Sequence, residues 1–285
     1  MTETVMGDDA EHREVALRLT GARRRAEALP VYPGALPSTL DAGYARQDEA
    51  IALWGRPVAG WKVGKIPDAW LARMGEERLV GPIFASAVQA PSAGARTADG
   101  LPVYEGAFDV IPGGFAAVEA EFVFGIGRDA PPGKRAWTDE EALAMVDSLH
   151  VGAELAGSPM PMINDLGPAV VVSDFGNNAG LILGPAVVDW RAALRDDLAC
   201  RTRVDEVEVG QGRASGIAGG LVAALRFALA RCAIRGMPLR AGQWVSTGAA
   251  TGIHDVVAGQ HARVMFDGIA EIVIAMRQAR PEEGA

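Results

Sequence analysis

A chain of 285 residues is long enough to bury a large core without disulfide staples. Its 49% hydrophobic and 22% charged residues are typical of a globular protein, and a formal net charge of -9 argues against a nucleic-acid partner, because an acidic surface repels phosphates. Cys200 and Cys232 form no CxxC pair, and no apolar run approaches the roughly 18 residues that span a bilayer. We therefore expect a cytoplasmic protein that is neither secreted nor inserted in a membrane.

Two helices are predicted at the start of the chain. Apolar residues recur at helical spacing from Glu11 to Leu29 and again from Leu40 to Trp54, where Gly55 ends the second pattern. We expect these helices to form a small N-terminal helical unit, residues 1–56. The remainder, residues 57–285, is predicted to be the main domain.

Strands are expected to dominate the main domain, because short apolar stretches there are separated by glycine and proline. The longest predicted strand runs from Ala116 to Ile126. Shorter strands are predicted at residues 58–63, 80–84 and 181–183, and a closing meander at residues 244–247, 262–266 and 269–275.

Two helices are predicted within the main domain. The first runs from Thr138 to about Leu155 and is opened by a capping box, in which Thr138 caps the helix and Glu141 follows three residues later. The second is an amphipathic segment from Ile217 to Ile234, which is rich in alanine and leucine.

The pattern that carries chemistry is a Glu-x-Glu pair on the longest predicted strand. Side chains alternate along a strand, so Glu119 and Glu121 point the same way, with alpha carbons about 7 Å apart. Two carboxylates that close repel each other unless a cation or solvent separates them. Mg²⁺ and Mn²⁺ prefer carboxylate oxygens, so a divalent metal site is one interpretation of the pair. The other, which the pair alone favours, is a strand with one solvent-exposed face on which both glutamates are merely polar.

A third carboxylate is expected from the predicted helix that follows. Asp147, His150 and Glu154 fall on one face of that helix. Spacing alone leaves Asp147 and Glu154 as equal candidates.

Several segments between about residues 40 and 275 carry a combined pattern: Gly60-Trp61-Lys62-Val63-Gly64, Glu119-Ala120-Glu121, Ala153 to Ser158, Asp174 to Gly184, Leu239 to Gly248 and Gly259 to Ile274. Together, and in this order, they resemble the 2-oxopent-4-enoate (2-hydroxypentadienoate) hydratase branch of the fumarylacetoacetate hydrolase superfamily. The resemblance implies that Glu119, Glu121 and Glu154 bind Mg²⁺ or Mn²⁺. It also implies an α+β fold with a mixed beta-roll core, and homo-oligomers; a decarboxylase is a further candidate partner.

The resemblance places Lys62 at the active site, where an ammonium group can attract a substrate carboxylate or transfer a proton. Asp174 is a second catalytic candidate, and Asn178 and Thr247 are candidates for binding substrate and water. The sequence departs from the family at Ser158-Pro159, at residues 174–178 and at residues 247–249, and these departures put the substrate in doubt more than the metal.

The implied activity is that of a lyase that hydrates a 2-hydroxy-2,4-dienoate to a 4-hydroxy-2-oxo acid. The same metal site would also serve a decarboxylase of a 2-oxo-3-enedioate. An acylpyruvate hydrolase ranks third, because hydrolysis needs a base and none of the four histidines stands in a suitable motif. Gly125 to Ala130 mimics a dinucleotide fingerprint, but Pro131 and Pro132 stand where its helix would begin. A non-catalytic subunit is disfavoured because all three ligands are present.

Overall fold

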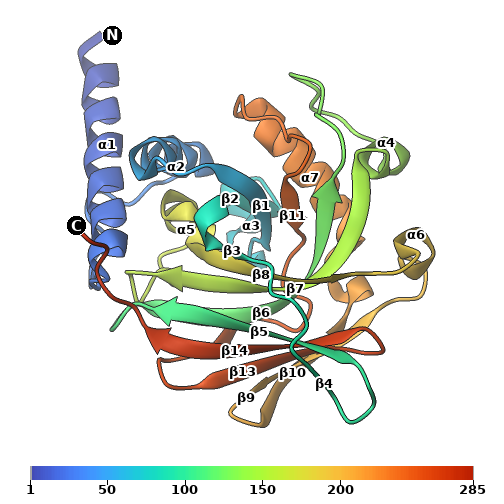
Figure 1. Ribbon diagram of the computed structural model, residues 1–285. Coiled ribbons are helices and arrows are strands. Elements are labelled where there is room, and N and C mark those ends of the chain that lie inside the picture. The colour runs from blue at the N-terminus through green and yellow to red at the C-terminus, as the bar shows by residue number, and fades with distance from the viewer. Residues whose placement is uncertain (1, 285) are drawn as a thin grey trace.

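Two curved sheets make up most of the chain, and helices cover one side of the first sheet (Figure 1). The computed structural model describes residues 2–284, with side chains from residue 9 onward. The first sheet has the strand order β2-β1-β11-β6-β7-β8-β3, and β12 pairs with β6. Its strands are β1 (Val58–Lys65), β2 (Arg78–Phe84), β3 (Val88–Gln89), β6 (Phe115–Ile126), β7 (Val146–Ser158), β8 (Asn178–Ala186), β11 (Trp244–Ser246) and β12 (His254–Asp255).

The second sheet lies below the first in Figure 1 and has the order β10-β9-β13-β14-β5-β4. Its strands are β4 (Ala95–Arg96), β5 (Pro102–Val110), β9 (Ala199–Val204), β10 (Val207–Arg213), β13 (His261–Phe266) and β14 (Ala270–Gln278). The predicted C-terminal meander is therefore wrong in part. β13 and β14 form an antiparallel pair, but β11 lies in the other sheet, between β1 and β6.

The helices differ greatly in length, and among the described residues none is both long and apolar enough to cross a bilayer. The second predicted helix is confirmed at both ends, because Thr39 Oγ1 accepts from the Ala42 N–H and Gly55 ends it at a φ of 67°. The helices are α1 (Thr2–Arg25), α2 (Leu40–Trp54), α3 (Asp68–Met74), α4 (Asp139–Leu143), α5 (Pro168–Ser173), α6 (Trp190–Ala193) and α7 (Gly220–Ile234), with short 3₁₀ turns η1 (Ala85–Ala87), η2 (Phe175–Asn177) and η3 (Ala214–Gly216).

The predicted helix from Thr138 to Leu155 is wrong beyond its first turn. The capping box of Thr138 and Glu141 is present, but α4 ends at Leu143 and the chain continues as the strand β7. This strand is covered on both faces for most of its length, so its sequence lacks the alternation that marks a half-exposed strand. Gly152 fits this crowded setting, because an added Cβ would lie 3.0 Å from the Ile182 carbonyl oxygen.

Packing between the sheets fixes the direction of the side chains of β6. The ring of Phe122 lies 5.5 Å from that of Phe266 on β13, so the even-numbered residues of β6 face the second sheet. The odd-numbered residues, including Glu119 and Glu121, face the other side. The carboxylates thus lie on the face of the first sheet that the second sheet leaves free.

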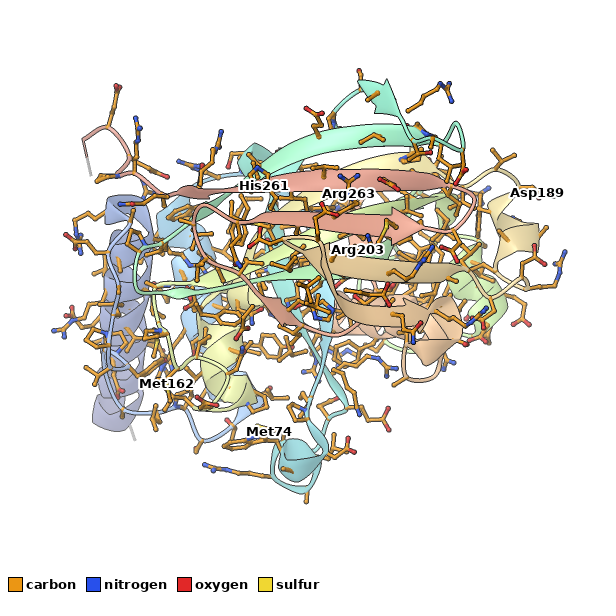
Figure 2. The ribbon with its side chains drawn as sticks, turned by 90° about the horizontal axis from the view of Figure 1, so that it is seen from below. Met74, Met162, Asp189, Arg203, His261 and Arg263 are labelled. Carbon is orange, nitrogen blue, oxygen red and sulfur yellow. The ribbon has the colours of Figure 1, made fainter. Side chains whose placement is uncertain are left out.

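The outer face of the second sheet carries charged side chains (Figure 2). Arg203 of β9 and Arg263 of β13 lie opposite each other, and Arg263 pairs with Glu271 at 2.6 Å. His261, at the start of β13, is exposed. This face is therefore a solvated surface, separated from Glu119 and Glu121 by the core between the sheets.

Candidate metal centre

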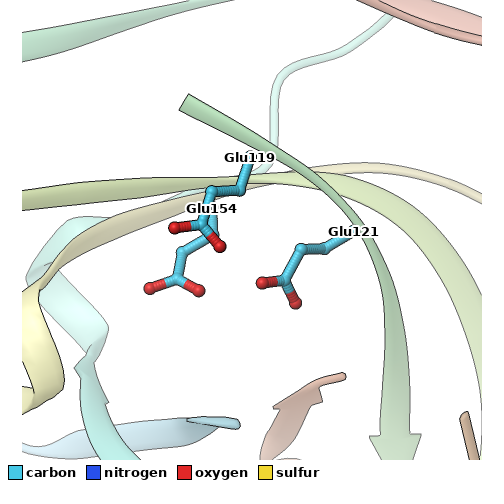
Figure 3. Close-up of side chains that lie close together, drawn as sticks. All are labelled: Glu119, Glu121 and Glu154. Atoms are coloured by element: carbon cyan, nitrogen blue, oxygen red, sulfur yellow. The ribbon is translucent and has the colours of Figure 1, made fainter. Parts of the chain in front are cut away.

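Two neighbouring strands bring three glutamates together (Figure 3). β6 and β7 pair antiparallel with Glu119 directly opposite Glu154, and Glu121 follows two residues along the same face of β6. Carboxylate oxygens from the three residues lie within 4.8 Å of one another, and all three side chains are buried. Strand pairing forms the cluster, and Glu154 lies on β7 and not on the helix that the sequence predicted.

Protein donors satisfy only one oxygen of Glu121 and one of Glu154. Glu121 Oε2 accepts from the Gly248 N–H at 2.8 Å and from the Ser246 hydroxyl. Glu154 Oε1 accepts from Asn178 Nδ2 at 3.1 Å and lies 3.3 Å from Lys62 Nζ. Glu121 Oε1 and Glu154 Oε2 are buried without a hydrogen-bond partner in the described residues. Such orphaned oxygens suit a hard divalent cation, so the residues present fit Mg²⁺ or Mn²⁺.

The pKa values of the cluster reflect the repulsion between its buried carboxylates, which a cation would relieve. Burial, together with the charge of Glu154, raises the pKa of Glu119 to about 8, although Lys62 opposes the shift. Burial and the other two carboxylates raise the pKa of Glu121 well above its usual value. Burial lowers the pKa of Lys62, but the three carboxylates outweigh burial and raise it overall. The metal-free cluster therefore retains protons that a dication would displace.

A cavity of about 450 Å³ opens beside the cluster. Lys62 and Glu119 belong to its wall, and Thr247 of the predicted site lies there too. The Thr247 hydroxyl donates to the Phe122 carbonyl oxygen at 2.8 Å, which leaves its lone pairs available to a ligand. The other lining residues are Val63, Gly64, Lys65, Pro67, Arg78, Leu79, Asn164, Pro168, Val171, Asn177, Gly216, Ile217, Ala218, Gly248, Ala249, Ile253 and Asp255.

Two predicted residues lie near the cluster but do not line this cavity. Asn178 contacts Glu154 and lines a second cavity of about 270 Å³. Asp174 pairs with Arg23 of α1 at 2.6 Å and accepts from the Ser158 hydroxyl at 2.5 Å. Both residues are better placed to support the strands that carry the carboxylates than to contact a substrate. Asp147, the rival third ligand, is exposed and lies outside the cluster.

Replacing Asp174 with asparagine should lower the free energy of unfolding by about 3 kcal/mol, because a buried Arg23 would lose its counter-charge. Chemical denaturation measures this change. Asp109→Asn is the matched control, since its pair with Arg277 is exposed and contributes at most about 1 kcal/mol. A stable variant that no longer binds metal would contradict a supporting role for Asp174.

Three polar residues of the site were missed in the sequence. Ser246 holds Glu121, and Arg78 and Asn177 line the cavity. Asn177 follows two residues that also have positive φ, and its buried Oδ1 lacks a partner. A signal for this turn existed in the run Phe175-Gly176-Asn177, because glycine and asparagine favour the left-handed region. Ser246 and Arg78 carry no local signal, since strand pairing alone brings them to the site.

The chain resembles solved structures along almost its full length. A 4-oxalocrotonate decarboxylase from Pseudomonas putida G7, complexed with magnesium and adipate, superposes with a TM-score of 0.73 at 18% identity, over 94% of this chain and 97% of that chain. A fumarylpyruvate hydrolase from Pseudomonas aeruginosa, in complex with Mn²⁺ and pyruvate, gives a TM-score of 0.54 at 20% identity, over 79% of this chain and 91% of that chain. These superpositions establish a common fold and confirm the α+β class that the sequence predicted.

Comparison with curated protein sequences gives no match. The model of the fumarylacetoacetate (FAA) hydrolase C-terminal family matches residues 91–276, which include all three clustered glutamates. The chain therefore belongs to the fumarylacetoacetate hydrolase family.

Proposed function

We propose that the protein is a divalent-metal lyase that hydrates a 2-hydroxy-2,4-dienoate to a 4-hydroxy-2-oxo acid. The observation that carries the proposal is the buried cluster of Glu119, Glu121 and Glu154, with two unpartnered oxygens and Lys62 beside it, next to a cavity of ligand size. Mg²⁺ or Mn²⁺ is the proposed cofactor. When bound, it would supply a Lewis acid for the C1 carboxylate and the C2 oxygen of the substrate.

The residues of the chain would perform the remaining tasks. Lys62 lies where its ammonium group can hold the substrate carboxylate or move a proton at C5 of the dienol, which gives the 2-oxo-3-enoate. Water then adds its oxygen at C4 and a proton at C3. Thr247 and Asn177 are the proposed groups for positioning that water, because both residues line the cavity and each has a side-chain oxygen that can accept a hydrogen bond. Asn178 would keep Glu154 in place through its hydrogen bond.

Decarboxylation of a 2-oxo-3-enedioate is the second candidate. It needs a cation for the second carboxylate of the substrate, and Arg78 in the cavity wall offers one. The structural neighbour that is complexed with adipate is a decarboxylase. A 2-oxo-3-enedioate of the same chain length as adipate is therefore the substrate to test. Hydrolysis of an acylpyruvate has less support, because no histidine is among the residues that line the cavity.

The test is product analysis with protein that has been stripped of metal and then reloaded with Mg²⁺ or Mn²⁺. We expect 2-hydroxypenta-2,4-dienoate to disappear in an ultraviolet assay and a 4-hydroxy-2-oxo acid to form. A parallel reaction with 2-oxo-3-hexenedioate, monitored for carbon dioxide, decides between hydration and decarboxylation. Turnover that persists unchanged in EDTA would remove the metal from the proposal.

A further inference from the structure

One basic side chain in the wall of the cavity beside the glutamates is buried, and no buried carboxylate among the described residues pairs with it. Three basic residues belong to its wall: Lys62, Lys65 and Arg78. Lys62 faces Glu154, and Lys65 is exposed and pairs with Asp68. Arg78 is 8% exposed, and its carboxylate contact among the described residues is Glu77 at 3.4 Å, on a side chain that is 81% exposed. A guanidinium buried with so weak a counter-charge favours an anionic ligand.

Lys62 and Arg78 both line this cavity, and the hairpin of β1 and β2 spaces their backbone positions. Lys62 pairs with Gly81, whereas Lys65 pairs with Arg78. The two rows are three residues apart, or about 10 Å at the usual rise of a strand. This backbone spacing is on the length scale of a short extended molecule.

The guanidinium of Arg78 is held in place by the turn opposite. One Nη donates to the carbonyl oxygen of Ala218, and residues 216–218 themselves line the cavity. Nε of Arg78 makes no hydrogen bond to the described residues. A fixed guanidinium with a free donor matches the planar geometry of a carboxylate.

The cavity that Lys62 and Arg78 line is also suited to a carbon chain. Val63, Leu79, Val171 and Ile217 belong to the same lining and supply apolar surface. Among the described lining residues, Asp255 is acidic and lies outside the glutamate cluster. It is exposed, so solvent screens its charge.

We infer that Arg78 is a specificity-determining residue, which binds a carboxylate at the end of the substrate remote from its 2-oxo acid. The inference rests on the proposed function, because it takes the 2-oxo acid end to lie at Glu119, Glu121, Glu154 and Lys62. The preferred substrates are then dicarboxylates of about six carbons, whichever reaction follows.

The test compares a diacid and a monoacid of the same length in wild type and in Arg78→Met. With 2-hydroxyhexa-2,4-dienedioate, kcat/KM of the variant should fall about 30- to 100-fold, the effect of one lost charge-assisted contact, while kcat/KM for 2-hydroxyhexa-2,4-dienoate stays within about threefold. Arg201→Met is the control, because it removes an exposed cation of β9 that lies outside the cavity lining, and it should leave kcat/KM for both substrates unchanged. Equal losses on both substrates, or none, would overturn the assignment.

Two further measurements separate this inference from the proposed function and from misfolding. Calorimetry with adipate and hexanoate on the Mn²⁺-loaded wild-type protein needs no turnover, and adipate should bind at least tenfold more tightly. Equal affinities overturn the role of Arg78 even if the protein proves to be a hydratase. If Arg78→Met does not fold, Arg78→Lys retains the charge but not the planar fork, and it should still lose at least threefold of the preference for the diacid.

Discussion

Replacing Glu121 with glutamine should weaken Mn²⁺ binding by more than about 100-fold and leave the metal-free fold intact. The pKa of Glu121 is raised well above its usual value by burial and by the other two carboxylates, which favours the neutral carboxyl group that glutamine copies. The carbonyl oxygen of the new amide can still accept from Ser246 and Gly248. Its NH₂ group, which cannot bind a cation, would occupy the place of the orphaned Oε1.

Calorimetric titration with Mn²⁺ measures the affinity, and thermal denaturation with and without the metal measures the coupled stability. Wild type should gain several degrees in Tm at saturating metal, and Glu121→Gln should gain almost none. Asp147→Asn is the matched control, because Asp147 is the carboxylate that the sequence left as a rival ligand and that the structure places on the surface. Unchanged Mn²⁺ affinity in Glu121→Gln would remove this residue from the metal site.

The sequence predicted that Glu119 and Glu121 face the same way but placed Glu154 on a helix, and the difference has a physical reason. The first two are two residues apart on one strand, so the alternation of side chains alone predicts that they face the same way. Their relation to Glu154 depends on the pairing of β6 with β7, which a sequence does not display. Residues 146–158 contain alanine, leucine and glutamate, which favour helices, and burial of both faces in the sheet overrides that preference.

The supporting residues could not be predicted for the same reason. Ser246 lies opposite Lys62 because β11 inserts between β1 and β6, although these strands are far apart in the chain. Asp174 meets Arg23 across 151 residues. Local signals, by contrast, predicted the end of α2 at Gly55 and the capping box of α4. The sequence therefore predicts helix caps and the shared face of Glu119 and Glu121 well, and contacts between distant strands poorly.

The stability of the metal-free protein should fall as the pH rises from about 6 to 8. Glutamate in the unfolded chain titrates near 4.5, whereas burial and the charge of Glu154 raise the pKa of Glu119 to about 8 in the folded state. Between these values the folded protein retains a proton that the unfolded chain has released. Stability then decreases with pH by at most about 1.4 kcal/mol per pH unit for each such proton. Denaturant unfolding in EDTA, with Glu119→Gln as the variant that lacks the group, measures the difference in slope.

Metal binding should show the opposite dependence on pH, because the cation must displace the retained protons. Mn²⁺ affinity is expected to rise about tenfold per pH unit between pH 6 and 8 for each proton displaced. Calorimetry in two buffers of different ionisation enthalpy counts the protons directly, and at least one should be released per metal ion at pH 7. Titrations that release none would contradict either the raised pKa values of Glu119 and Glu121 or the binding of the cation at these two residues.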